Sequence, residues 1–153
     1  MTDRPHPDGV DCLWLASDHE GHVAAFVTGG VGPIPILALN CEDVLVADLE
    51  ELVCDLPRIS VASLLISIKR PDDFLDLAER GVFVYDWTDV QRTSSESVFA
   101  YEPVAAPVTP IRVDKLPLTL VNIVNDLNFG KIKFADGQPI DVRFFFECRE
   151  GLC

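Results

Sequence analysis

The chain has 153 residues, of which 48% are hydrophobic and 24% charged, proportions that are typical of a folded globular domain. Asp and Glu number 25 against 12 Lys and Arg, so the formal net charge is −13. Because carboxylates repel phosphate groups, this charge argues against binding to nucleic acid or to an anionic membrane and favours a basic protein partner. An acidic cell interior, in which many proteins carry excess carboxylates, is the alternative explanation.

The N-terminal residues, the length of the apolar segments and the cysteine count indicate the cellular compartment and the number of domains. The first eleven residues contain no apolar segment typical of a secretory signal. The longest nearly uncharged run, residues 59–68, is about half the length of a membrane-spanning helix. Five cysteines, without a C-x-x-C pair, favour reduced thiols. We therefore expect a cytoplasmic chain with a flexible tail over residues 1–9 and one domain over residues 10–153.

The clearest local pattern is a strand–helix–strand unit in the middle of the chain. Alternating apolar residues predict a strand over residues 64–68. Pro71 suits the first turn of the helix that follows, and Gly81 suits the position just past its end. The apolar spacing places Leu77 on the buried face of this helix. A second strand is predicted over residues 82–85.

The N-terminal part of the chain predicts a β-hairpin followed by a helix. Apolar residues alternate over residues 10–17 and 22–28, and the short polar turn between them suits a hairpin. The glycine-rich residues 29–35 lack the spacing of a nucleotide-binding loop, so a simple turn is expected there. Residues 41–55 have the apolar spacing of a helix, with Asn40 as its N-cap.

After the central unit, the sequence predicts one more strand and a third helix. Residues 97–104 alternate as a strand, and the prolines that follow confine the next segment to a sheet edge or an extended path. Residues 108–113 then have the composition to rejoin the sheet. A helix is predicted over residues 116–127, with Asp114 as its cap.

The C-terminal residues predict a final hairpin. Its strands would occupy residues 131–134 and 140–147, and the consecutive phenylalanines 144–146 require that at least one ring faces away from the core. The complete set of elements predicts an α+β domain with an antiparallel or mixed sheet of about five to seven strands and three helices packed mainly on one face.

The helix predicted over residues 41–55 is unusually acidic, because it carries six carboxylates and no lysine or arginine. Most exposed helix faces mix both signs of charge. The sequence therefore predicts that these carboxylates bind a basic partner. The six residues are Glu42, Asp43, Asp48, Glu50, Glu51 and Asp55.

A second candidate partner site follows the strand predicted over residues 82–85. Its members are Asp86, Trp87, Asp89 and Arg92. They would stand at the end of a strand, where sites often lie, and Trp and Arg are enriched among the energetically important residues of interfaces. The alternative is structural, with Trp87 closing the core and Asp89 pairing with Arg92.

The sequence contains no catalytic motif. His19 and His22 flank Glu20, but their spacing differs from the zinc motif H-E-x-x-H, and a turn is predicted there instead of a helix. No serine lies in a G-x-S-x-G nucleophile elbow. We therefore predict no catalytic, cofactor-binding or metal-binding residue.

Two segments resemble a set of small uncharacterised bacterial proteins. The segments are DCLWLASDHEGHVAAF, residues 11–26, and GVFVYDWTDVQR, residues 81–92. Proteins of that set open with a Trp-containing hairpin and carry a Y-D-W-x-D-V segment after a short helix. They are similar in size and charge to immunity proteins, which neutralise toxins. The resemblance implies protein binding and carries over no catalytic residue.

The leading hypothesis is a non-enzymatic binder of a basic partner, such as an immunity-type inhibitor of a nuclease toxin. One alternative is a small enzyme or ligand-binding domain with its site at residues 86–92. The other is a structural or regulatory domain without a dedicated toxin. The sequence leaves the choice between monomer and homodimer open.

Overall fold

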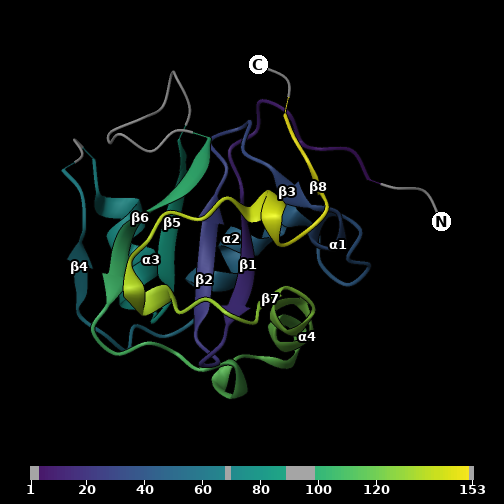
Figure 1. Cartoon of the computed structure of the whole chain (residues 1–153). Coiled ribbons are helices and arrows are strands. Elements are labelled where there is room, and N and C mark those ends of the chain that lie inside the picture. Colours follow the sequence, from purple (N-terminus) through teal and green to yellow (C-terminus); the bar gives the residue numbers. More distant parts are fainter. Residues whose placement is uncertain (1–3, 68–69, 89–98, 152–153) are drawn as a thin grey trace.

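The computed structural model describes residues 4–67, 70–88 and 99–151 (Figure 1). Six strands form a mixed sheet with the order β4-β6-β5-β2-β1-β7, and β3 pairs with β8. The strands are β1 (Leu13–Asp18), β2 (Val23–Val27), β3 (Ile34–Pro35), β4 (Ala62–Leu64), β5 (Phe83–Thr88), β6 (Ala100–Pro107), β7 (Asn128–Phe129) and β8 (Cys148–Arg149). The helices are α1 (Ile36–Leu39), α2 (Val46–Cys54), α3 (Asp72–Glu79) and α4 (Leu118–Asp126). The predicted α+β class is confirmed.

One face of the sheet is aromatic. Phe26 stacks on Trp14 and on Tyr85, with ring centroids 4.3 and 4.9 Å apart, and Tyr101 meets Phe26 edge-on at 5.2 Å. The register pairs Trp14 with Phe26 and Phe26 with Tyr85, so these rings share a face. The C-terminal segment, yellow in Figure 1, crosses this face and inserts Phe134 among the rings.

The opposite face of the sheet packs against α2 and α3, which lie behind the sheet in Figure 1. Leu49 and Val53 of α2 and Leu77 of α3 are buried there. Helix α4 packs beside β1, close to the edge that β7 forms. Among the described helices, none has the length and apolar character needed to cross a bilayer.

The predicted N-terminal hairpin and the predicted helix of the central unit, α3, are confirmed. Strands β1 and β2 pair antiparallel from Leu13 opposite Val27 to Ser17 opposite Val23. Gly81 follows α3 with φ +95°, and a Cβ atom at this position would lie 2.8 Å from Ile111. Both the backbone conformation and the close contact require glycine there.

The predicted starts of the two other helices are wrong. Helix α2 begins at Val46, because Leu45 before it has an extended backbone, with φ −80° and ψ 145°. Asn40 instead ends α1, and its side-chain oxygen accepts a hydrogen bond from the backbone N–H of Arg4. Asp114 lies in a separate 3₁₀ turn, Val113–Lys115, and α4 starts directly after Pro117.

The strand predictions around the prolines also need correction. The predicted strand over residues 64–68 overlaps the edge strand β4 (Ala62–Leu64) only at Leu64, and residue 68 lies outside the described residues. Strand β6 runs through Pro103 to Pro107 inside the sheet, because Pro103 stands where the register with β5 shifts and a bulge tolerates the missing N–H. Residues 108–113 form no strand of the sheet; only Arg112 makes an isolated bridge with His22.

The predicted final hairpin is wrong. Its residues form two 3₁₀ turns, Phe134–Asp136 and Val142–Phe144, and β8 pairs with β3. The physical reason is the aromatic face, because Phe134 and Val142 become buried against the sheet instead of facing each other across a turn.

Candidate functional site

An acidic groove of about 550 Å³ lies between the segment that follows α1 and helix α4. Its lining residues are Leu37, Asn40, Cys41, Glu42, Asp43, Asn122, Ile123, Asp126 and Leu127. Three of them are carboxylates, and no lysine or arginine is among them. We call this site the acidic groove.

Two elements build the groove from opposite sides. Helix α1 ends at Asn40, and the backbone carbonyl of Cys41 accepts a hydrogen bond from the Arg4 guanidinium, which holds this segment in place. On α4, Asn122 and Asp126 are four residues apart and therefore share a face beside the buried Ile123. The groove thus brings carboxylates from two distant parts of the sequence to one place.

The floor of the groove is apolar. Leu37 is 59% exposed, while Ile123 and Leu127 belong to the core. Lys and Arg side chains combine an aliphatic stem with a charged head, so they match an apolar floor with an acidic rim. The groove has the shape and charge to receive such a side chain from a partner.

The remaining acidic residues of the predicted helix divide into two groups. Asp48, Glu51 and Asp55 are spaced three and four residues apart and face away from the buried residues of α2. We call them the outer acidic face of α2. Glu50 lies on the flank of α2 that faces α3. All six predicted carboxylates are exposed, and within the described part of the chain none of them forms a salt bridge.

Glu50 lines a smaller cleft of about 110 Å³ between α2, α3 and the sheet. Although the Glu50 side chain is exposed, the surrounding protein removes part of the hydration of its carboxylate, and this desolvation, together with the negative charges of Asp11 and Asp73, raises the pKa of Glu50 above its ordinary value. Cys12 lines the same cleft, and burial raises the pKa of its thiol. A protonated thiol is a poor nucleophile, so the chemistry of this cleft does not favour covalent catalysis.

The structure does not bring Asp86 and Trp87 together into one site. They are neighbours on β5, so their side chains point to opposite faces of the sheet. Asp86 is half-buried opposite Glu102, and Trp87 is buried with its ring 5.3 Å from that of Tyr101. Trp87 therefore closes the core. The other two predicted members, Asp89 and Arg92, lie outside the described residues.

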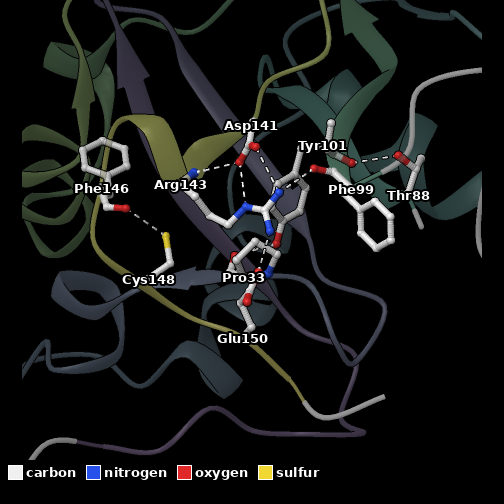
Figure 2. Close-up of polar contacts among 10 residues, drawn as sticks. Pro33, Thr88, Phe99, Tyr101, Asp141, Arg143, Phe146, Cys148 and Glu150 are labelled. Atoms are coloured by element: carbon white, nitrogen blue, oxygen red, sulfur yellow. Dashed lines mark hydrogen bonds and ion pairs between the residues drawn. The ribbon is translucent and has the colours of Figure 1, made fainter. Parts of the chain in front are cut away.

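Figure 2 shows a polar cluster around Arg143 that the sequence reasoning missed. The Arg143 guanidinium donates hydrogen bonds to both carboxylate oxygens of Asp141, at 2.8 and 3.0 Å, to Glu150 at 2.8 Å and to the Phe99 carbonyl at 3.1 Å. The hydrogen bonds that Asp141 accepts from Arg143 hold the pKa of Asp141 below its ordinary value. Beside Arg143, the Phe144 side chain is 86% exposed. Three consecutive phenylalanines were the only sequence signal for this surface.

No group of three or more His, Cys, Asp or Glu side chains with the arrangement of a metal site occurs among the described residues. Comparisons with protein-family models, with curated proteins and with solved structures give no match.

Proposed function

We propose that this chain is a non-enzymatic, acidic protein-binding domain that holds a basic partner in the acidic groove. The specific form that we propose is an immunity-type inhibitor of a basic toxin, for example a nuclease. The observation that carries the proposal is the combination of three carboxylates, an apolar floor and no basic lining residue in one groove of about 550 Å³.

The proposed mechanism is competition for a phosphate-binding surface. A nuclease holds its substrate with lysine and arginine side chains, which attract carboxylates for the same reason that they attract phosphates. Glu42, Asp43 and Asp126 would occupy positions where phosphates otherwise bind. The net charge of −13 would accelerate the encounter, since complementary charge raises association rates.

The proposal sets the chain in the cytoplasm. Four of its cysteines, Cys12, Cys41, Cys54 and Cys148, are free thiols. A reducing compartment would keep thiols in this state, and it is also the compartment in which an inhibitor would meet a newly made toxin.

Co-expression with the product of the neighbouring reading frame tests this proposal. We expect a basic neighbour that is toxic alone, is neutralised by this chain and co-purifies with it. A variant with Asp43→Lys and Asp126→Lys should lose protection, whereas a charge-matched variant with Asp48→Lys and Glu51→Lys should retain more of it. A neighbour that is neither basic nor toxic and does not co-purify contradicts the proposal.

A further inference from the structure

The chain before β1 lies against the end of helix α1, where the acidic groove begins. We call residues 4–9 the N-terminal strap, which is part of the purple trace that leads into β1 in Figure 1. The Arg4 backbone N–H donates a hydrogen bond to the side-chain oxygen of Asn40 at 2.9 Å. The Arg4 guanidinium donates to the carbonyl of Leu39 at 3.3 Å and to the carbonyl of Cys41. Asn40 and Cys41 line the acidic groove, so the strap contacts two of its lining residues.

Two further hydrogen bonds fix the strap along its length. His6 Nε2 donates to the carbonyl of Gly32 at 2.7 Å, and the N–H of Gly9 donates to the carbonyl of Gly30 at 2.8 Å. Both acceptors precede β3, and α1 follows directly after β3. The strap is therefore attached to the same part of the chain at several points, which limits the freedom of the Arg4 side chain.

Few hydrogen bonds fix the segment that carries Glu42 and Asp43. Residues 40–45 lie between α1 and α2, and both carboxylates are exposed. Among the described residues, only Arg4 makes a hydrogen bond to the main chain of residues 41–43. Helix α1 has no basic residue in its last turn, although the carbonyls at a helix end carry partial negative charge. The Arg4 guanidinium supplies positive charge at these carbonyls.

The contacts of Arg4 leave the carboxylates of the groove without a partner of opposite charge. Its hydrogen bonds go to two carbonyls and one side-chain amide. Within the described part of the chain, Arg4 forms no salt bridge with Glu42, Asp43 or Asp126. A guanidinium paired with these carboxylates would compete with a basic partner, whereas Arg4 in its observed position does not.

We propose that Arg4 is a positioning residue for the acidic groove. Its guanidinium holds the end of α1, and it thereby places Glu42 and Asp43 before a basic partner arrives. A segment that is ordered in advance does not have to be ordered on binding, so loss of the guanidinium should weaken binding. This role rests on the proposed function, because the groove that Arg4 orders is the one that would hold the basic partner.

The charge of Arg4 makes the direction of this effect diagnostic. Arg4→Gln removes one positive charge, so the formal net charge changes from −13 to −14. Long-range attraction alone then predicts faster association and tighter binding of a basic ligand. Positioning by Arg4 predicts weaker binding, which is the opposite result.

Binding of a fluorescent hexa-arginine peptide, measured by anisotropy at low salt, distinguishes the two effects. Arg4→Gln should bind the peptide about threefold more weakly than wild type. Arg70→Gln changes an exposed arginine before α3 and alters the net charge equally, so it should bind as tightly as wild type or more tightly. Arg4→Lys should recover part of the loss, because an ammonium group can bond to one of the carbonyls. The double variant Asp43→Lys, Asp126→Lys should lose most of the binding, which locates the peptide in the acidic groove.

NMR relaxation of the free chain tests the positioning role without any ligand. In Arg4→Gln, the order parameters of the Glu42 and Asp43 amides should fall from about 0.85, typical of rigid backbone, toward about 0.6. In Arg70→Gln they should stay unchanged. Unchanged order parameters in Arg4→Gln, or peptide binding as tight as that of Arg70→Gln, would overturn the positioning role. A wild-type chain that fails to bind the peptide contradicts the proposed function instead, and the order parameters then still decide whether Arg4 holds the segment.

Discussion

Glu50 lines one cleft with Asp11 and Asp73, and partial desolvation of its carboxylate together with these like charges raises its pKa. A carboxyl group with a raised folded-state pKa binds more protons in the folded than in the unfolded chain. Its contribution to stability is therefore complete below the ordinary pKa of 4.5 and is lost as the pH rises through the folded-state value. At neutral pH, the charged form of Glu50 destabilises the fold.

The substitution Glu50→Gln should therefore stabilise the chain at pH 7. We expect a gain of roughly 0.5 kcal/mol, because the side chain is exposed enough for solvent to screen much of the repulsion. The gain should disappear below about pH 4.5, where wild-type Glu50 is protonated. Urea titrations at both pH values measure this difference. The control Glu51→Gln, on the outer acidic face of α2, should change stability at neither pH.

We predict the opposite pH dependence for the contribution of Asp141 to stability. Hydrogen bonds from Arg143 lower its pKa, so its stabilising effect is present above its ordinary pKa of 3.8 and is lost as the pH falls through the folded-state value. Asp141→Asn should cost about 1 kcal/mol at pH 7, as expected for a partly exposed, bidentate pair. The cost should shrink in acid. If Asp141→Asn matches wild type at pH 7, the Arg143 cluster does not secure the C-terminal segment.

The substitution of Leu77 tests whether helix α3 packs against the sheet as the structure shows. Leu77 is 4% exposed and packs in the core between α3 and the sheet. Leu77→Ala should lower the free energy of unfolding by roughly 2–5 kcal/mol through lost burial and a residual cavity. Leu118→Ala is the control, because its side chain is exposed and should cost less than about 0.5 kcal/mol. Equal effects in a denaturant titration would mean that α3 does not pack as described.

The elements that were predicted correctly are specified by patterns of residues that lie close together along the chain. The hairpin of β1 and β2 follows from alternation and a short turn. Helix α3 follows from apolar spacing between Pro71 and Gly81, which mark its two ends. In these segments the residues that determine the structure are close together along the chain.

The errors concern pairings between distant segments. The two-residue strands β7 and β8 pair with β1 and β3, and no local pattern specifies partners so far apart. The C-terminal segment alternates like a hairpin, yet its apolar residues pack on the aromatic face. Asp126 was missed as a groove residue for the same reason, because only the packing of α4 beside β1 brings it near Glu42 and Asp43.

At the scale of the whole molecule, the acidic groove lies near one edge of the sheet. Strand β4 forms the edge on the left of Figure 1, and α4, which lines the acidic groove, lies beside β1 near the opposite edge.

The central claim is that a basic partner binds the acidic groove, and the association rate measured against salt tests it most directly. Two double variants change the net charge by the same amount: Asp43→Lys with Asp126→Lys in the acidic groove, and Asp48→Lys with Glu51→Lys on the outer acidic face of α2. Comparing them therefore distinguishes the effect of where the carboxylates lie from the effect of the total charge. Surface substitutions of this kind usually alter stability by less than about 0.5 kcal/mol, and circular dichroism checks that both variants remain folded.

Stopped-flow mixing with the neighbouring gene's product should give a wild-type association rate that falls steeply between about 50 and 300 mM salt, as charge steering requires. The groove variant should associate about tenfold more slowly at low salt and with a flatter salt dependence. The variant on the outer acidic face of α2 should lie closer to wild type. Identical rates and salt dependences for the wild type and the groove variant would contradict the account.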